Sequence, residues 1–333
     1  MDSKKSIEMN TFLMTHKLFW LASLSGMLMA CSPSTEISTG DPIPAATVIT
    51  PLVSAEWVQQ HIDDSDLVIL DVSVLVRMDD NGFETISGRN EYEKAHIPNA
   101  RFADLKGNLS NQSTTEEFIM PSPEQFQKAI RELGVNNNSR LVLYSIDDQS
   151  WPARLWWMLR WAGFDHVSIL DGGISAWKEQ GFLLTAESST IRSGDFMLEL
   201  RSNVIADAGQ VSAAITDENV TIVDSLSAVH YEGDFSMYPR AGHISSAINI
   251  PSSDFVDESG LFRPVDELEL ILEIDRDVRT ITYCGGGVAA SNVAFNLVRA
   301  GHTDVAVYMG SLQEWTKDPT NPMTIGETPE ADK

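Results

Sequence analysis

At 333 residues the chain is too long for one ordinary core and suits two domains of roughly 100–150 residues. Hydrophobic residues make up 43% of it and charged residues 21%, which is typical of a folded globular protein and excludes wholesale disorder. The formal net charge of -25 argues against nucleic-acid binding, because phosphate recognition needs a basic surface.

Residues 1–30 have the layout of a lipoprotein signal peptide. Lys4, Lys5 and Lys17 precede the apolar stretch LFWLASLSGMLMA, which is too short to span a bilayer comfortably. The stretch runs into Cys31 and resembles a bacterial lipobox, which implies a lipidated, membrane-anchored protein that faces the periplasm. An ordinary cleaved signal and an uncleaved membrane anchor are the alternatives.

Residues 31–47 are rich in Ser, Thr and Pro, and we expect a flexible tether there. Beyond them the chain repeats itself. The first copy contains DLVILDVS, AHIPNA and RLVLYS, and the second contains VTIVDSLS, GHISSAINIP and RTITYC in the same order. This organisation predicts a first domain at 48–183, a polar linker at 184–203, a second domain at 204–320 and a tail at 321–333.

Short β-branched runs alternate with helical stretches in each copy. This alternation predicts two α/β domains, each a parallel sheet covered by helices on both faces. Gly163 and Gly301 follow predicted helices, where a left-handed residue would end them. His96 and His243 occupy matching segments of the two copies, which favours a structural role for both.

The segment RTITYCGGGVAASNVAFNLV places Cys284 at the carboxyl end of a predicted buried strand, ahead of three glycines and a helix. Ligands bind at this edge of open α/β sheets. Backbone amides at the start of the helix can form an anion cradle, and the helix N-terminus adds partial positive charge. The cradle residues are Gly285, Gly286, Gly287, Val288 and Ala289. Both effects favour the nucleophilic thiolate of Cys284, which suits sulfur transfer.

Cys284 has other interpretations. Free Cys is often a small buried hydrophobe, but an inert core residue needs no triglycine loop. A Cys-(x)5-Arg phosphatase would need Arg where Ala290 stands. The seven His show no metal-ligand spacing, and the glycines lack the downstream acid of a dinucleotide fingerprint, so we expect neither a metal nor a cofactor.

The repeat, the segments HIPNA, GHISSAINIP and DGGISAW, and above all CGGGVAAS resemble the tandem rhodanese family, which includes thiosulfate and 3-mercaptopyruvate sulfurtransferases. The resemblance covers residues 52–315. It implies that only the second domain is catalytic and that Cys284 carries sulfur as a persulfide. Ser145 takes the equivalent place in the first copy. Because a Ser alcohol cannot replace the thiolate, we expect the first domain to close one wall of the cleft.

The resemblance leaves the sulfur donor open. Mercaptopyruvate-type members carry Cys-Gly-Ser-Gly-Val-Thr-Ala, so Gly286 replaces Ser and Ala289 replaces Thr. The two cationic residues of the thiosulfate-type loop, Cys-Arg-Lys-Gly-Val-Thr, are absent. Family members hold the donor's anionic end with basic residues ahead of the GHI segment; Arg240 matches one, and His230 stands at the other. Phe118 stands where mercaptopyruvate enzymes offer a His.

The sequence therefore predicts an exported, lipid-anchored sulfurtransferase in which Arg240 and His230 bind the substrate. Its donor would be a small anion such as thiosulfate or 3-mercaptopyruvate, and its acceptor a thiol or cyanide. The alternative is a lipid-anchored binding or sulfur-delivery module whose acceptor is another envelope protein, with little turnover on small donors. The weakened cationic lining favours the module, and the intact nucleophile loop favours the enzyme.

Overall fold

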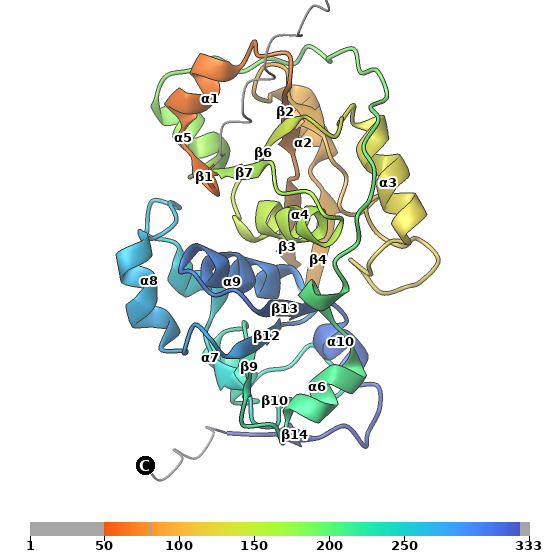
Figure 1. Cartoon of the computed structure of the whole chain (residues 1–333), viewed down its shortest axis with the longest axis vertical. Coiled ribbons are helices and arrows are strands. Elements are labelled where there is room, and N and C mark those ends of the chain that lie inside the picture. Colours follow the sequence, from red (N-terminus) through yellow and green to blue (C-terminus); the bar gives the residue numbers. More distant parts are fainter. Residues whose placement is uncertain (1–49, 80–81, 327–333) are drawn as a thin grey trace, which may run out of the picture. The chain divides into compact units, whose positions relative to one another are not determined.

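The structure, a computed structural model, describes residues 50–79 and 82–326 (Figure 1). The predicted signal peptide at 1–30, the lipidation site Cys31 and the predicted tether at 31–47 lie outside the described residues. Between residues 50 and 326, no described helix combines the length and the apolar character needed to cross a membrane.

The first half is built on a five-stranded parallel sheet with the order β1-β7-β6-β2-β5. Its strands are β1 (Leu52–Val53), β2 (Leu67–Asp71), β5 (Arg101–Phe102), β6 (Arg140–Tyr144) and β7 (Val167–Leu170). Its helices are α1 (Ala55–His61), α2 (Arg89–Lys94), α3 (Pro123–Glu132), α4 (Ser150–Trp161) and α5 (Gly173–Glu179). An antiparallel hairpin of β3 (Val74–Asp79) and β4 (Gly82–Ser87) follows β2. We did not predict this hairpin from the sequence.

The second half has a five-stranded parallel sheet with the order β11-β9-β12-β13-β8. Its strands are β8 (Ile205–Ala206), β9 (Val220–Asp224), β11 (Ile248–Asn249), β12 (Arg279–Tyr283) and β13 (Val305–Tyr308). Its helices are α6 (Ala208–Ala214), α7 (Ala228–Tyr231), α8 (Val265–Leu272), α9 (Val288–Arg299) and α10 (Ser311–Trp315), with 3-10 turns η1 (Ser202–Val204) and η2 (Ser252–Phe255). The short strands β10 (His243–Ile244) and β14 (Met323–Thr324) pair antiparallel.

The two sheets have the same order of equivalent strands, with β1, β7, β6, β2 and β5 matched by β8, β13, β12, β9 and β11. Side chains alternate between the faces of each sheet. In β2, Val68 and Leu70 enter one hydrophobic cluster and Ile69 enters another. In β12, Ile281 packs beneath α6 and α10. The prediction of two α/β domains with helices on both faces is therefore confirmed.

Helices α4 and α9 pack against each other and join the two halves into one continuous hydrophobic cluster. Figure 1 shows them side by side in the middle of the molecule. Their contact includes Trp156 and Phe295, whose rings meet edge to face with centroids 5.0 Å apart. The interface places the end of α4 that begins at Ser150 near the loop that carries Cys284, since Ser150 and Cys284 line one cavity.

The glycine predictions hold: Gly163 has φ 84° and Gly301 has φ 95°, both left-handed, and each follows the C-cap residue of its helix, α4 or α9. The residues predicted as linker, 184–203, contain no helix or strand before η1, but they are not loosely attached. Phe196 is fully buried, and the Glu199 amide donates to the Ala162 carbonyl at 2.9 Å. A polar stretch is therefore fixed along the first half by one aromatic anchor.

Asp224, at the end of β9, makes the stability of the fold depend on pH. Burial raises its pKa to about 6, although the Leu226 amide donates to its carboxylate at 2.9 Å. An unfolded Asp titrates near 3.9, so its contribution to stability is fully present below about pH 4 and is lost as the pH rises through 6. Asp224→Asn should therefore raise the free energy of unfolding at pH 8 by roughly 2–3 kcal/mol.

Urea unfolding at several pH values measures this effect, with Asp234→Asn at an exposed position as the matched control. We expect the gain to shrink as the pH is lowered towards 4, where the wild-type carboxyl is protonated in the folded state and about half protonated in the unfolded state. A gain of equal size at pH 8 and pH 4 would show that the carboxyl charge is not its source.

Candidate active site

Cys284 follows the last residue of β12, the central strand of the second sheet, and α9 begins at Val288. The side chain is only 3% exposed, yet it lines a cavity of about 940 Å³. The Cys284 amide donates to Ser311 Oγ at 3.1 Å, and its carbonyl accepts from the Leu312 amide at 3.0 Å. These backbone contacts fix the loop and leave the thiol at the wall of the cavity.

The sulfur accepts a hydrogen bond from the Gly287 amide, with a distance of 3.1 Å from N to Sγ. Gly287 caps α9 with φ 81°, which a residue with a β-carbon adopts only at a cost. A β-carbon there would also lie 2.4 Å from Arg154 Nη1 and 3.0 Å from the Met309 backbone. Both backbone shape and crowding therefore require glycine at the position that holds the sulfur.

The other predicted cradle residues line the cavity: Gly285, Gly286, Val288 and Ala289. The hydrogen bond recorded to the sulfur comes from Gly287 alone among the described cradle amides. A β-carbon on Gly286 would lie 3.2 Å from the side-chain amide nitrogen of Gln313. Gln313 therefore fills the space beside Gly286.

Gly285 makes room for a side chain that the sequence did not single out. The Tyr238 hydroxyl lies 1.7 Å from where a β-carbon on Gly285 would stand, and Tyr238 lines the same cavity as Cys284. Burial raises the pKa of Tyr238, and the nearby Cys284 charge adds to the shift. Its hydroxyl therefore stays protonated and offers a hydrogen-bond donor to the cavity.

His230 lies in the cavity, as expected of a substrate-binding residue. Its Nδ1 is 2.9 Å from Ser227 Oγ, and its buried Nε2 has no hydrogen-bond partner among the described residues. Burial lowers the pKa of His230 below its ordinary value of 6.5. The imidazole is therefore neutral at pH 7 and acts there as a polar group rather than as a cation.

Arg240 is not brought to the cavity. Its Nη1 and Nη2 donate to the Asn321 carbonyl, both at 2.9 Å, and it is absent from the residues that line the space around Cys284. The guanidinium is held by carbonyls of the segment after α10, which sequence spacing does not reveal. The predicted pairing of Arg240 with His230 around one substrate is therefore not seen.

The first half contributes one wall of the cavity. Phe118 and Trp151 line it, with ring centroids 5.1 Å apart, and so do Val76 and Thr85 of the unpredicted hairpin. Ser145, equivalent to Cys284 at the end of β6, donates its hydroxyl to the Asp148 carbonyl at 2.7 Å and does not line the cavity. The first half thus shapes the site without adding a nucleophile at the equivalent position.

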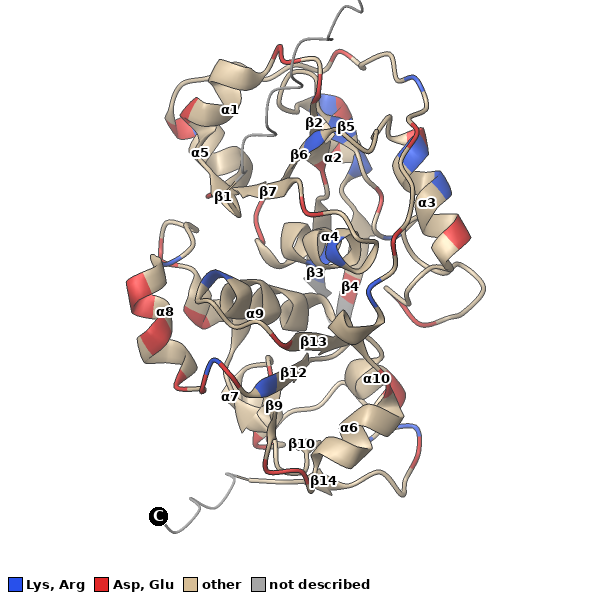
Figure 2. Cartoon of the chain, viewed as in Figure 1, with Lys and Arg blue, Asp and Glu red and all other residues tan. Residues whose placement is uncertain are grey.

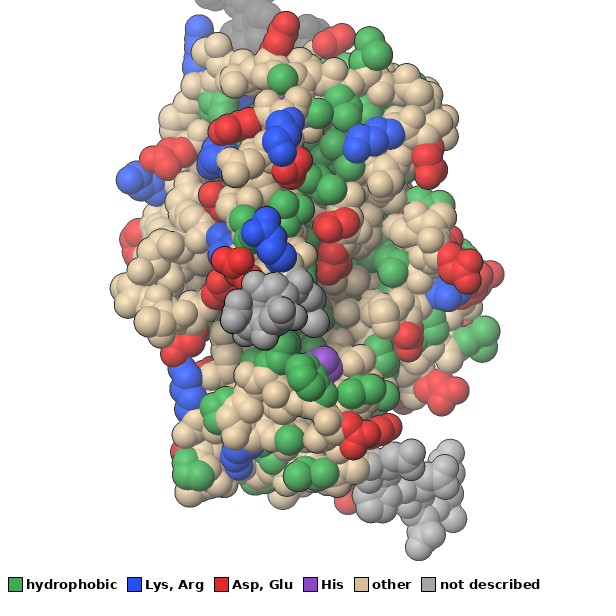
Figure 3. Space-filling model, turned by 180° about the vertical axis from the view of Figure 1, so that it is seen from behind, with side chains coloured by type: hydrophobic (Ala, Val, Ile, Leu, Met, Phe, Trp, Pro, Cys, Tyr) green, Lys and Arg blue, Asp and Glu red, His purple; other side chains and the backbone are tan. Residues whose placement is uncertain are grey.

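No Lys or Arg appears among the described residues that line the cavity, although three carboxylates do: Glu117, Asp147 and Asp148. Glu117 is paired with Lys106 at 2.6 Å, whereas Asp147 and Asp148 are exposed. Acidic side chains also dominate elsewhere, as on α8 in Figure 2. Figure 3 shows acidic, hydrophobic and His side chains around a hollow on the opposite face. An anionic donor therefore meets no cationic side chain on the wall.

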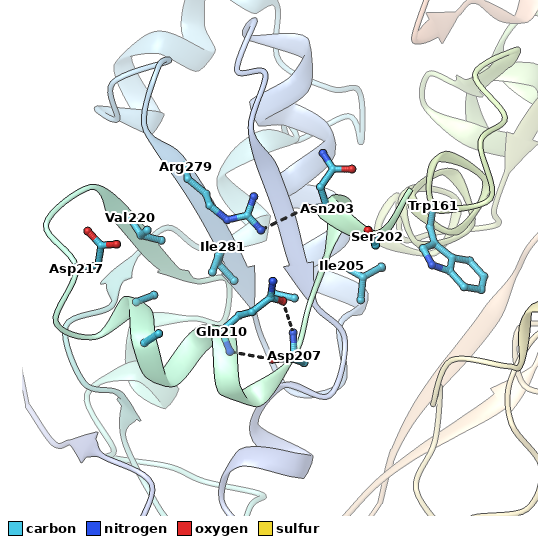
Figure 4. Close-up of a pocket in the computed structure, with 13 residues that line it drawn as sticks. Trp161, Ser202, Asn203, Ile205, Asp207, Gln210, Asp217, Val220, Arg279 and Ile281 are labelled. Carbon is cyan, nitrogen blue, oxygen red and sulfur yellow. Dashed lines mark hydrogen bonds between the residues drawn. The ribbon is translucent and has the colours of Figure 1, made fainter. Parts of the chain in front are cut away.

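A second cavity, of about 780 Å³, lies between α6, β12 and the chain around η1 (Figure 4). Its one cationic side chain, Arg279, is already bound to Asp304 at 2.5 Å, and the Asp207–Gln210 capping box closes another side. None of the predicted site residues lines it. Among the described residues, no group of His, Cys, Asp or Glu is arranged to hold a metal ion.

A thiol at a strand-to-helix corner, held by a backbone amide beside a cavity in a tandem α/β protein, fits a thiol-dependent group-transfer enzyme. Residues 54–180 and 207–318 each match the rhodanese-like domain. The chain belongs to the rhodanese family.

Similar proteins agree with this assignment. The 3-mercaptopyruvate sulfurtransferase of Escherichia coli is 32% identical over 269 residues, which cover 79% of this chain and 94% of that protein. The thiosulfate sulfurtransferase of Gallus gallus is 30% identical over 274 residues, covering 79% and 92%. The crystal structure of the Escherichia coli enzyme has a TM-score of 0.71 and covers 79% of this chain and 99% of its own. The chain is a sulfurtransferase of the thiosulfate or 3-mercaptopyruvate type.

Proposed function

We propose that Cys284 carries the transferred sulfur as a persulfide. The thiolate attacks the outer sulfur of thiosulfate, the S–S bond breaks, and its electron pair leaves with sulfite. With 3-mercaptopyruvate the C–S bond breaks instead, and the carbon takes up a proton to give pyruvate. A thiol or cyanide then attacks the outer sulfur of the persulfide, and the bonding pair returns to Cys284. No external oxidant or reductant is needed.

The observation that carries this proposal is the 3.1 Å hydrogen bond from the Gly287 amide to Cys284 Sγ in a loop that borders a cavity. An amide that donates to Cys284 Sγ favours the thiolate from which the persulfide forms. The helix N-terminus of α9 acts in the same direction. The protonated Tyr238 hydroxyl can also donate a hydrogen bond in the cavity, either to the group that leaves the sulfur donor or to the molecule that accepts the sulfur.

Intact mass spectrometry tests the proposal directly. The protein is incubated with thiosulfate or 3-mercaptopyruvate, freed of donor, weighed, and then treated with cyanide. We expect one added sulfur atom per chain and its stoichiometric release as thiocyanate. A protein that turns over donor without ever gaining this mass would transfer sulfur by another route and would overturn the persulfide.

His230 sets the affinity for anionic donors in this proposal. Because burial lowers the pKa of His230, the imidazolium forms only below pH 6.5, so the KM for thiosulfate should fall as the pH is lowered towards 5. His230→Arg supplies a permanent charge and should lower the KM about tenfold at pH 8. The pH dependence of KM in the wild type, His230→Asn and His230→Arg measures both effects.

The matched control is His166→Arg, which adds the same charge at an exposed position that does not line the cavity. An equal fall of KM in both Arg variants would mean that overall charge, not His230, governs donor binding.

The second candidate function is a sulfur-delivery module that hands its sulfur to an envelope protein. The absence of Lys and Arg from the described cavity wall favours it, because small anionic donors would then bind weakly. Loading followed by transfer to a protein thiol, with slow turnover of small donors, distinguishes it from the enzyme. Rapid multiple turnover with cyanide as acceptor would exclude it.

We also infer that Cys31 is lipidated and anchors the protein in the bacterial envelope. The support is the sequence alone, a basic segment and an apolar stretch that end at this Cys. Growth of expressing bacteria with a labelled fatty acid should label the full chain and leave Cys31→Ala unlabelled. Label that persists in Cys31→Ala, or a mature protein that begins at another residue, would contradict the anchor.

A further inference from the structure

Arg154 is a charged side chain at the centre of the molecule that the sequence did not single out. It belongs to α4 of the first half and is 1% exposed. Its Nη2 donates to the Phe118 carbonyl at 2.6 Å, and its Nη1 contacts Met309 Sδ in the second half. The guanidinium therefore bridges the two halves from inside the protein.

The guanidinium lies directly behind the loop that holds the sulfur. Arg154 Nη1 is 2.4 Å from the place of a β-carbon on Gly287, and the Gly287 amide donates to Cys284 Sγ. The positive group and the sulfur thus both lie next to Gly287. Arg154 belongs to α4, and Gly287 directly precedes α9. Figure 1 shows these two helices next to each other.

No ion pair between Arg154 and a carboxylate is recorded within the described residues. An unpaired charge in the interior is strongly unfavourable. Burial lowers the pKa of Arg154 to about 10, and the charge of Cys284 is what opposes that shift. The neighbourhood therefore provides one candidate for the missing negative charge, the sulfur of Cys284.

The other titratable groups that face the cavity do not supply a positive charge at neutral pH. They are Glu117, Asp147, Asp148, His230 and Tyr238. Three are carboxylates, burial lowers the pKa of His230, and burial raises the pKa of Tyr238. Asp224 and Glu314, on β9 and α10, are acidic as well. The described cavity wall therefore supplies no cation to offset a sulfur anion, whereas Arg154 lies beside the glycine that contacts the sulfur.

We propose that Arg154 is the counter-ion of the Cys284 thiolate and persulfide, supplied by the non-catalytic half of the protein. The arrangement leaves the described cavity wall free of cations and still places a positive charge near the sulfur, because that charge acts across the Gly287 backbone. Arg154 is then a positioning residue for the nucleophile, so the first half contributes to the chemistry of the site as well as to the cavity wall. The inference rests on Cys284 as the sulfur carrier.

Alkylation of Cys284 by iodoacetamide as a function of pH tests the counter-ion, and it does not depend on sulfur transfer. Arg154→Met removes the charge and keeps a similar bulk, so the alkylation profile should move about one unit to higher pH and the rate at pH 7 should fall about tenfold. Arg154→Lys keeps the charge and should recover most of the wild-type profile. Arg160→Met, the same substitution on α4 at a side chain that pairs with Asp165, should leave the profile in place.

A folded Arg154→Met protein with the wild-type profile would overturn the proposal. If Arg154→Met does not fold, Cys284→Ser with Arg154 left in place still decides the matter. The Ser variant removes the anion, so the wild type should be more stable than Cys284→Ser at pH 8, and the difference should shrink as the pH is lowered and the thiol takes up a proton. A difference that does not depend on pH would reject the pair. An unchanged alkylation profile together with normal persulfide loading would reject Arg154 alone and leave the proposed function intact.

Discussion

Serine at position 284 is expected to lower the rate of thiocyanate formation from either donor by roughly a thousandfold or more. The hydroxyl fits the space of the thiol and can still accept from the Gly287 amide, so the loop should keep its conformation. Only the nucleophile changes, because an alcohol is not ionised near neutral pH and forms no persulfide. Steady-state rates of Cys284→Ser with thiosulfate and with 3-mercaptopyruvate measure the loss.

The same substitution at the other cysteine, Cys31→Ser, is the matched control and should leave the rate unchanged, since the chain has two cysteines. Thermal unfolding of both variants checks that the fold persists. If Cys284→Ser kept its activity or still gained the mass of a sulfur atom, the sulfur would be carried by another group and the assignment of the nucleophile would be wrong.

Alanine at position 287 should lower activity by about a hundredfold, the usual effect of losing one backbone donor to a reacting anion. The new β-carbon would meet Arg154 Nη1 at 2.4 Å, and the residue would need φ 81°, so the Gly287 amide must turn away from Cys284. We expect a loss of about 2–4 kcal/mol in the free energy of unfolding from backbone strain and crowding together. Urea unfolding and the persulfide loading rate measure the two losses.

Gly260→Ala separates the two causes. Gly260 has φ 82°, nearly the value of Gly287, but nothing lies within 4 Å of its missing β-carbon. This variant should lose about 1–2 kcal/mol from backbone strain alone and keep its loading rate. Equal losses of stability, with full activity in Gly287→Ala, would show that the Gly287 amide does not hold the sulfur.

The fold was predictable because its signals are local and occur twice. In β6 and β12, RLVLY and RTITY each place β-branched or aromatic residues on a buried strand. The repeat then implies two sheets of the same kind. The β3–β4 hairpin was not predicted, since its strands carry mixed polar and apolar residues that give no distinct period.

The composition of the site was only partly predictable. Cys284 and its glycines are adjacent in the sequence, so their geometry follows from one strand, one loop and one helix. Arg240 was expected at the cavity, but carbonyls of the segment after α10 hold it elsewhere. The sequence does show Arg154 as a single charged residue within the apolar run WPARLWWML. That run does not indicate that Arg154 lies beside the loop of Cys284.

The amino-acid sequence by itself determined the tandem architecture and the place of Cys284 in the fold, because a short stretch of backbone is enough to form a strand end, a glycine loop and a helix start. The tertiary structure alone decided which charges act on the sulfur. The packing of α4 on α9 brings Arg154 behind Gly287, and burial leaves His230 neutral. Electrostatic interactions depend on distance in space and on burial, and neither quantity is contained in the spacing of residues along the chain.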